Sequence, residues 1–335
     1  MITIAFFNNK GGVGKTSLVY HLSWMFAELG RKLIAVDLDP QANLTSMCLD
    51  ENRLEELWPD GKHPLTIEGI IEPIRRGIGD ISEPHVEPVL KNLGLMVGDL
   101  TLSTFEDRLS ENWLKCHNGD EAAFRTTTAF YRAILRAGVT TGADVALIDV
   151  GPNLGAINRA ALIASDFVVV PLGSDLFSLQ GLRNLGPTLQ SWRTTWQQLK
   201  HKNPAPDLLL PSGNMHPVGY VVMQHAIRED RPVKAYQKWM DKIPTEYRKS
   251  VMAHPSGAAL TVKQDPHCLA TLKHYRSLMP MAMEAHKPIF LLKPADGAIG
   301  AHAAAVRDCY RDFENLSTRI LQAVTPVLDA SLPEA

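Results

Sequence analysis

The feature that most constrains this chain is a glycine-rich segment close to its start, Lys10-Gly11-Gly12-Val13-Gly14-Lys15-Thr16-Ser17. Glycines let backbone N–H groups wrap around a phosphate, a lysine contacts the outer phosphate oxygens, and a hydroxyl ligates Mg²⁺. This chemistry does not require Lys10, and Asn9 replaces the first glycine of the general pattern GxxxxGK[ST]. The segment is therefore a deviant Walker A phosphate loop. Its candidate nucleotide-binding residues are Gly11, Gly12, Val13, Gly14, Lys15, Thr16 and Ser17.

The sequence on either side of the loop predicts the elements that a phosphate site needs. Residues 2–7 form an apolar, β-branched run typical of a buried parallel strand. Residues 17–29 have apolar side chains at helical spacing, and we expect one face to hold Leu18, Leu22, Met25, Phe26 and Leu29. A strand, a glycine loop and a helix in this order direct the helix N-terminus at the anion.

Strands and helices alternate along the 335 residues, which predicts a doubly wound α/β fold with a mostly parallel sheet and helices on both faces. We expect one domain over 1–335, with a Pro-rich loop at 201–217 and a basic insertion at 228–280. The expected strands are 2–7, 33–37, 93–97, 145–149, 167–171 and 218–223, with 288–292 as a further candidate. The expected helices are 17–29, 66–75, 122–136, 158–165, 179–200, 233–242, 266–279 and 301–324.

Cysteine usage and hydropathy predict a reduced, cytoplasmic protein. Four cysteines are scattered without a CxxC pair, and no basic and apolar leader precedes the first strand. No apolar run approaches the roughly 20 residues that cross a bilayer. One face near the end of the chain is apolar, and we expect it to pack in the core rather than on a membrane because little positive charge accompanies it. It holds Leu316, Ile320, Val324 and Leu328.

Acidic residues follow two of the predicted strands. Asp37 and Asp39 come at the end of strand 33–37, and Asp149 ends the run Val-Ala-Leu-Ile-Asp. The carboxyl ends of parallel strands line the crevice where α/β folds bind ligands, and a carboxylate there can hold Mg²⁺ through its bound water. Because Pro40 turns the chain, we expect one of Asp37 and Asp39 to face the metal and the other the attacking water.

These motifs together resemble the ParA/MinD family of deviant Walker ATPases, and specifically its ParA branch. The resemblance covers about three quarters of the chain in the family order. One departure is Gly151-Pro152, where the family usually has two prolines after the strand. The matching strings are FNNKGGVGKTS, VDLDPQANLT, ALIDVGPNLGAINRAALIASDFVVVPL, SDLFSLQGLRNL, GYVVMQH and HKPIFLLKPADGAIGAHAAAVRD.

The resemblance implies roles for individual residues, with ATP and Mg²⁺ as cofactors. Lys15 would bind the β- and γ-phosphates and Thr16 would ligate the metal. Asp37 and Asp149 would hold Mg²⁺ through its bound water, and Asp39 would position the hydrolytic water. Lys10 would reach the nucleotide of a second subunit, so that a homodimer forms when ATP is bound.

A basic stretch offers a surface for DNA. Residues 228–293 hold twelve Lys and Arg against six Asp and Glu, and the rest of the chain carries a net charge of −8. ParA-like proteins bind double-stranded DNA non-specifically, and phosphate contacts need charge more than shape. An ordinary solvated helix face is the open alternative for these residues. The candidates for DNA binding are Lys234, Lys238, Lys242, Arg248, Lys249, Lys273 and Arg276.

The predicted function is a slow, Mg²⁺-dependent ATPase whose dimer binds the nucleoid and is released when a ParB-like protein or a cargo adaptor stimulates hydrolysis. Such a cycle partitions or positions DNA or other cargo, without a membrane. An alternative stays open, in which the chain is an orphan ParA-like regulatory ATPase whose dimer assembles a protein complex, for example in defence. Under that alternative the 200–280 region docks a protein instead of DNA.

Overall fold

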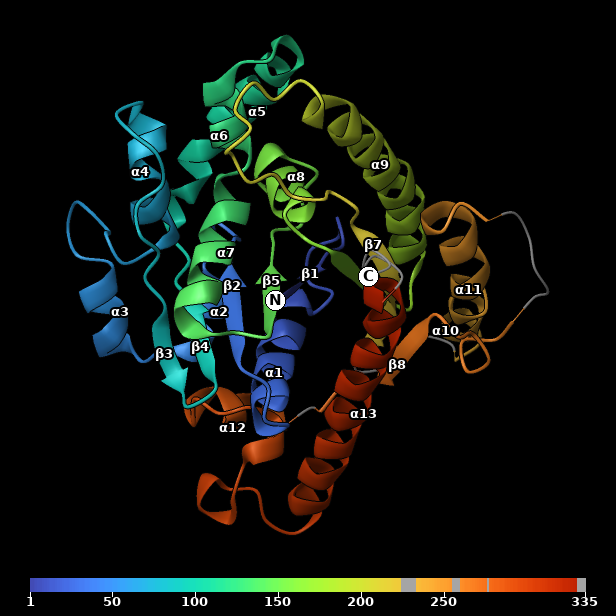
Figure 1. Ribbon diagram of the computed structural model, residues 1–335. Helices are drawn as coiled ribbons and strands as arrows, with labels where there is room; N and C mark the ends of the chain where they lie inside the picture. Colours follow the sequence, from blue (N-terminus) through green and yellow to red (C-terminus); the bar gives the residue numbers. More distant parts are fainter. Residues whose placement is uncertain (224–232, 255–259, 276, 330–335) are drawn as a thin grey trace. The chain divides into compact units, whose positions relative to one another are not determined.

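The computed structural model describes residues 1–223, 233–254, 260–275 and 277–329, and for 233–236 and 326–329 only the helical backbone (Figure 1). By its internal contacts the chain divides into two compact units. Unit 1 comprises Met1–Gly11, Lys15–Val168 and Thr188–His216, and unit 2 comprises Gly12–Gly14, Val169–Pro187 and Pro217–Ala335. The prediction of a single domain over 1–335 stays a prediction.

Unit 1 contains the first strands and helices of the chain. Its strands are β1 (Ile2–Phe6), β2 (Leu33–Asp37), β3 (Glu87–Leu90), β4 (Leu93–Met96) and β5 (Val145–Asp149). Its α-helices are α1 (Lys15–Glu28), α2 (Asn43–Cys48), α3 (Glu51–Leu57), α4 (Ile67–Arg76), α5 (Glu106–Lys115), α6 (Glu121–Thr127), α7 (Ala129–Thr141) and α8 (Ala156–Ile163), with 3₁₀ turns η1 (Leu100–Phe105) and η2 (Cys116–Asn118).

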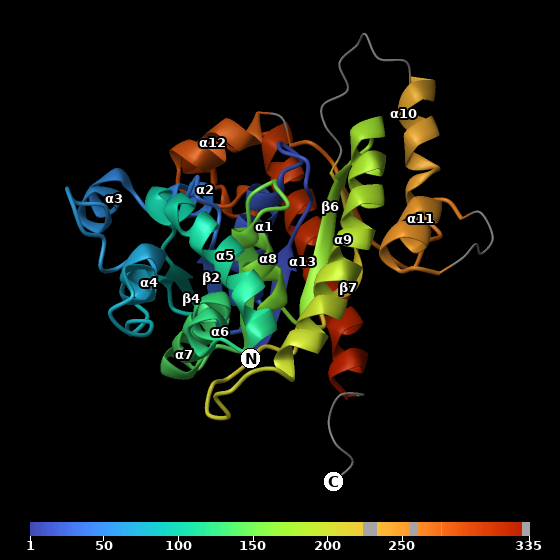
Figure 2. The ribbon, with the colours of Figure 1, turned by 90° about the horizontal axis from the view of Figure 1, so that it is seen from above.

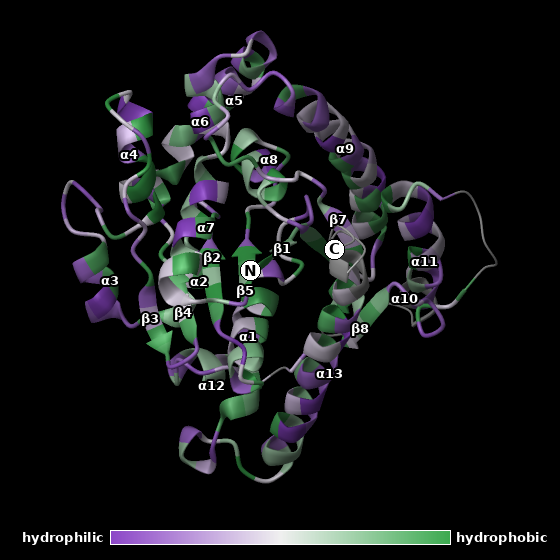
Figure 3. Cartoon of the chain, in the orientation of Figure 1, coloured by the Kyte–Doolittle hydropathy of each residue, from purple (hydrophilic) through white to green (hydrophobic). Residues whose placement is uncertain are grey.

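The sheet of unit 1 has the strand order β3-β4-β2-β5-β1. Strands β4, β2, β5 and β1 run parallel, and β3 pairs antiparallel with β4. Every residue of β2 and β5 is buried, so both faces of these strands are covered, as is typical of a parallel sheet between helix layers. Figure 3 shows both strands in the hydrophobic colour. The mostly parallel α/β fold predicted from the sequence is confirmed.

Four of the five residues predicted on the apolar face of α1 are buried. Leu18, Leu22, Met25 and Phe26 are fully buried, but Leu29 lies beyond the helix end and is 37% exposed. A histidine is also buried in this helix, and its Nδ1 lies 2.7 Å from the Ser17 carbonyl oxygen. Burial lowers the pKa of His21 to about 4, and the hydrogen bond to Ser17 opposes that shift.

The buried His21 predicts a loss of stability in acid. Between pH 6.5 and 4 the unfolded chain binds a proton that the folded chain does not, so the free energy of unfolding falls as pH falls. From pH 7 to 5 this group contributes a loss of about 2 kcal/mol. Urea unfolding at both pH values should show His21→Gln losing that much less than wild type, whereas the exposed-site control His201→Gln should behave as wild type. Equal losses in wild type and His21→Gln would contradict this.

Unit 2 holds the remaining elements, and three elements cross the division. Strand β6 (Phe167–Gly173), helix α9 (Leu176–Lys200) and strand β7 (His216–Met223) each have residues in both units. Strand β7 pairs parallel with β8 (Cys268–Leu272), and the order is β6-β7-β8. Figure 1 labels β7 and β8, and Figure 2 labels β6 and β7. The helical segments are α10 (Val233–Met240), α11 (Ile243–Glu246), the π-helix η3 (Tyr247–Val251), α12 (Leu278–Glu284), the 3₁₀ turns η4 (Ile289–Leu291) and η5 (Pro294–Asp296), and α13 (Ala301–Asp329).

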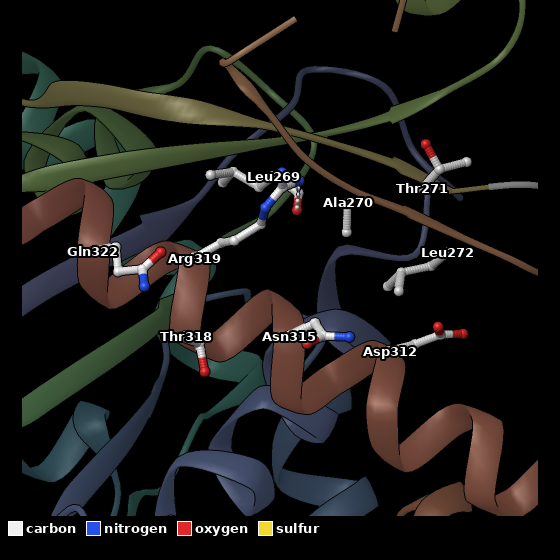
Figure 4. Close-up of a pocket in the computed structure, with 9 residues that line it drawn as sticks. All are labelled: Leu269, Ala270, Thr271, Leu272, Asp312, Asn315, Thr318, Arg319 and Gln322. Atoms are coloured by element: carbon white, nitrogen blue, oxygen red, sulfur yellow. Dashed lines mark hydrogen bonds between the residues drawn. The ribbon is translucent and has the colours of Figure 1, made fainter. Parts of the chain in front are cut away.

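A groove of about 420 Å³ lies between the last strand, β8, and α13 (Figure 4). Arg319 of α13 donates to the carbonyl oxygens of Cys268 and Leu269, at 3.0 and 3.1 Å. An edge strand with unpaired carbonyls invites pairing with another chain, so Arg319 protects this edge.

The apolar face of α13 is buried at Leu316, Ile320 and Val324, in agreement with the predicted packing. The side chain of Leu328, predicted on the same face, lies outside the described residues. None of the helices in the described part of the chain combines the length and hydropathy needed to cross a bilayer.

Two of the predicted elements are wrong in unit 2. The helix expected at 266–279 is instead strand β8 followed by α12, because pairing with β7 overrides the local helical pattern. The strand expected at 288–292 is the 3₁₀ turn η4, whose Phe290 packs on the rings of Tyr310 and Phe313 in α13. The helix expected at 233–242 is confirmed as α10, which ends two residues earlier, at Met240.

One predicted helix of unit 1 is divided in two. The helix expected at 122–136 breaks between α6 and α7, where Thr128 leaves helical geometry at φ −98° and ψ 7°. Its hydroxyl donates to the Phe124 carbonyl oxygen at 2.8 Å. Such side-chain bonds compete with the helical backbone bonds, so the break follows from a threonine in this position. Helices α2, α3 and α5 and strand β3 of unit 1 were not predicted.

Candidate functional site

The phosphate loop joins β1 to α1, and α1 begins at Lys15 as its first residue. Gly12 and Gly14 have φ values of +70° and +85°, in the region that favours glycine, so the glycines of the motif are required by the backbone. The first N–H groups of a helix have no partner within the helix, and at α1 they belong to the segment that begins with Lys15 and Thr16. The loop therefore has the local geometry of an anion site.

Lys15 is a buried cation within unit 1. Its side chain is 6% exposed, and its Nζ donates to the Lys10 carbonyl oxygen at 3.3 Å. Burial lowers the pKa of Lys15, while the carboxylates of Asp149 and Asp39 act in the opposite direction. A buried ammonium is stabilised by negative charge, so the phosphate oxygens of a nucleotide fit this position.

Asp149 ends β5 as a buried carboxylate that is poorly compensated. It is fully buried, and neither of its oxygens has a hydrogen-bond partner among the described residues. Burial and the nearby Asp37 hold the pKa of Asp149 well above its usual range, and the neighbouring Thr16 hydroxyl and Lys15 only partly oppose this. A divalent cation would reverse the balance, so Asp149 and Thr16 fit a site for Mg²⁺ bound with a nucleotide.

Asp37 lies beside Asp149, because the two residues are in register on the neighbouring strands β2 and β5. Its Oδ2 accepts from the Thr45 backbone N–H and hydroxyl, at 2.9 and 2.8 Å, and its Oδ1 accepts from the Asp39 N–H at 3.3 Å. Burial raises the pKa of Asp37 to about 7, against the effect of the Thr45 bonds. Both carboxylate oxygens of Asp37 thus accept hydrogen bonds from the protein, and these bonds hold the turn that follows β2. Its role toward the metal stays a prediction.

Asp39 lies in that turn and is 6% exposed. Its Oδ1 accepts from the Gln41 N–H at 3.0 Å, so the carboxylate has a defined direction. The turn closes through Ala42, whose φ of 50° is unusual for a residue with a side chain. The structure thus brings Asp39 close enough to Lys15 and Asp149 for its carboxylate to influence the pKa of both. The water-positioning role of Asp39 stays a prediction.

Lys10 is half-buried, and its backbone N–H donates to Asn8 Oδ1 at 3.0 Å. Its predicted contact with a second subunit is not tested by a single chain. Val13 is fully buried, and Ser17 provides the carbonyl that His21 contacts. These residues shape the start of α1.

Sequence reasoning missed the residues that hold the loop after β5. Glu106 accepts hydrogen bonds from the Ala156 and Ile157 N–H groups, the second at 2.9 Å, and so caps α8 from the start of α5. Asn158 donates from its side chain back to the loop. The asparagine in the first turn of a predicted helix was a readable signal, but nothing in the sequence connects Glu106 with residue 156.

The candidate DNA-binding residues are only partly a free basic surface. Lys238, Lys242 and Lys249 are exposed, and Arg248 is half-buried and donates to the Pro244 carbonyl oxygen. Lys273 is paired with Asp308 at 2.8 Å. Arg276 and the side chain of Lys234 lie outside the described residues.

The spacing of Lys234, Lys238 and Lys242 predicts a lysine stripe along one helix with Trp239 on another face, and the structure differs in detail. Lys242 follows the end of α10, and the ammonium groups of Lys238 and Lys242 lie 5.2 and 5.3 Å from the ring centre of Trp239. A tryptophan ring attracts cations, so two exposed lysines and a half-buried tryptophan form one cation–π cluster in unit 2.

A family model described as "AAA domain" (AAA_31) matches residues 1–201. Curated relatives include Protein IncC of Escherichia coli, 28% identical over 193 residues, and the cell division protein PomZ of Myxococcus xanthus, 32% identical over 186 residues. These alignments cover 58% and 56% of this chain. The chain spans about half the length of these relatives, 47% and 50%.

Solved structures share the fold over nearly the whole chain. Protein DIP2308 from Corynebacterium diphtheriae has a TM-score of 0.73 at 23% identity, covering 97% of this chain and 99% of that one. An ATP complex of a Cyanothece McdA variant has a TM-score of 0.61 at 14% identity, covering 97% and 96%. A Borrelia burgdorferi putative plasmid partition protein bound to AMPPNP has a TM-score of 0.55 at 18% identity, covering 96% and 98%. At these identities the likeness shows the fold alone.

Proposed function

Because the chain belongs to the AAA_31 family of AAA domains and is distantly homologous to the ParA-type partitioning ATPases, we propose that it is a Mg²⁺-dependent ATPase acting as a nucleotide switch. The observation that carries the proposal is the electrostatic coupling of a buried ammonium, Lys15, with a buried carboxylate that lacks hydrogen bonds, Asp149. The phosphates of MgATP would supply further negative charge to Lys15, and its Mg²⁺ would supply positive charge to Asp149. ATP and Mg²⁺ are the cofactors of this proposal.

Different residues of unit 1 have different roles in the proposed hydrolysis. MgATP supplies the transferable phosphoryl group together with a divalent charge. Lys15 would neutralise phosphate oxygens, and Thr16 and Asp149 would hold the metal, Asp149 through water. Asp39, directed by the Gln41 amide, orients the attacking water. Catalysis of this kind rests on positioning and electrostatics, so a slow basal rate and control by a partner are expected.

The switch proposed here is an ATP-dependent homodimer in which Lys10 contacts the nucleotide of the partner subunit.

The proposed cargo side is non-specific double-stranded DNA, with release stimulated by a ParB-like or cargo-adaptor protein. Lys238 and Lys242, held around Trp239, and the exposed Lys249 supply phosphate contacts. The orphan regulatory alternative is favoured by the pairing of Lys273 with Asp308, which removes one cation from the proposed DNA surface. In that case the nucleotide-gated dimer assembles a protein complex.

The deciding measurement is retention on non-specific double-stranded DNA with ATP, with ADP and without nucleotide, with mass measured in parallel. Asp39→Ala should bind DNA as a dimer only with ATP, and Lys10→Ala should neither dimerise nor bind. The double variant Lys238→Ala, Lys242→Ala should still dimerise. The slope of its log binding constant against log salt concentration should be smaller in magnitude by about 2, because two phosphate contacts are lost. The control Lys91→Ala, at an exposed lysine of unit 1, should leave this slope unchanged. If the protein dimerises with ATP but does not bind DNA at low salt, the DNA-binding proposal is wrong and the regulatory alternative is favoured.

A further inference from the structure

The side chain of Asn158 holds the near end and the middle of the loop between β5 and α8. Asn158, in the first turn of α8, is 1% exposed. Its Nδ2 donates to the Gly151 carbonyl oxygen at 2.9 Å, to the Asn153 carbonyl oxygen at 2.7 Å and to Asn153 Oδ1 at 3.1 Å. The Asn153 side chain in turn accepts from the Gly155 N–H at 2.9 Å. A single buried amide therefore closes the loop upon itself.

The far end of this loop is fixed by the Glu106 carboxylate, which accepts from the N–H groups of Ala156 and Ile157. A Cβ at Gly155 would lie 2.6 Å from Glu106 Oε1 and 2.8 Å from Asn153 Oδ1, so a larger residue there would displace these two acceptors. Negative charge at a helix N-terminus is stabilising, so the Glu106 carboxylate is a favourable cap for α8. Glu106 thus restrains the far end of the loop, and Asn158 restrains its near end at Gly151.

At its near end the loop lies against Asp39. A Cβ at Gly151 would be 3.3 Å from Asp39 Oδ1 and 3.8 Å from Asn158 Nδ2, so the Gly151 backbone separates the two side chains closely. Glycine provides no stiffness of its own, unlike a proline, whose φ is set by its ring. The hydrogen bond from Asn158 to the Gly151 carbonyl oxygen is the side-chain restraint on this backbone, which lies next to the Asp39 carboxylate.

We propose that Asn158 is a positioning residue for hydrolysis, because it holds the Gly151 backbone against Asp39 and so keeps that carboxylate directed at the attacking water. The proposal rests on the function proposed for Asp39. In this proposal the Asn158 amide restrains the flexible Gly151 backbone. The restraint is a hydrogen bond that Asn158 donates to Gly151, so an aspartate at 158, which has the same shape but no N–H donor, should not support hydrolysis at the wild-type rate.

The test compares Asn158→Ala and Asn158→Asp with a matched control, Asn112→Ala. Asn112 is also buried, in α5, but its Nδ2 donates within its own helix, to the Arg108 carbonyl oxygen at 2.8 Å. We expect both Asn158 variants to lower kcat by about tenfold or more with KM and nucleotide Kd unchanged within about threefold. Asn112→Ala should lose stability without losing kcat. An unchanged kcat in the Asn158 variants, or a rise in KM that accounts for the whole loss, overturns the proposal.

Hydrogen exchange separates this proposal from the proposed function. Since the Gly151 backbone lies next to Asp39 and Asp39 accepts from the Gln41 N–H, release of the loop should speed amide exchange in the segment around Gln41 as well as in 150–157. If wild type hydrolyses no ATP, the proposed function fails, and exchange alone then decides the positioning role. Faster exchange at both segments in Asn158→Ala, but not in Asn112→Ala, supports it. Exchange that changes only within 150–157 overturns it.

Discussion

Replacing Lys15 with methionine is expected to reduce ATP hydrolysis by about a thousandfold or more and to weaken nucleotide binding, because the side chain keeps its length but loses its charge. In the structure this ammonium is buried beside Asp149 and Asp39, so no exposed lysine can replace it. Steady-state phosphate release and titration with a fluorescent ATP analogue measure the two effects separately.

The matched control is Lys91→Met, at an exposed lysine in the turn between β3 and β4. It removes one positive charge from the same unit and should leave turnover and affinity unchanged. If Lys15→Met kept wild-type affinity and turnover, the assignment of residues 10–17 as the phosphate loop would be wrong.

Replacing Asp39 with asparagine is expected to lower turnover by roughly 10²-fold or more while the affinity for ATP stays within about threefold of wild type. Asparagine can still accept from the Gln41 N–H and fits against Gly151, so the local geometry is kept and only the charge is lost. The loss should therefore appear in kcat and leave KM nearly unchanged, as measured by steady-state hydrolysis across ATP concentrations.

Asp60→Asn, at an exposed aspartate of the same unit, is the control for a general effect of one negative charge. It should hydrolyse ATP as wild type does. Equal turnover in wild type and Asp39→Asn would exclude Asp39 as the group that orients water, and an equal loss of affinity and turnover would make it a nucleotide-binding residue instead.

Much of unit 1 was predictable because its elements carry strong local signals. The strand and helix around the phosphate loop and the strands that end in Asp37 and Asp149 follow from short apolar runs and helical spacing. The glycines of the loop could be read directly, since two of them need positive φ. Strand β8 and the turn η4 could not be read, because pairing with β7 and packing on α13 decide them.

The sequence by itself determined the parts that depend on neighbours in the chain: the phosphate loop, the acids at the strand ends, the parallel α/β fold and the family. Only the tertiary structure decided what depends on residues far apart. It placed Glu106 on the N-terminus of α8, paired Asp37 with Thr45, and set Gly151 between Asn158 and Asp39. The reason is physical, since local patterns report backbone preference and burial, whereas the direction and charge of a side chain depend on the groups that folding brings to it.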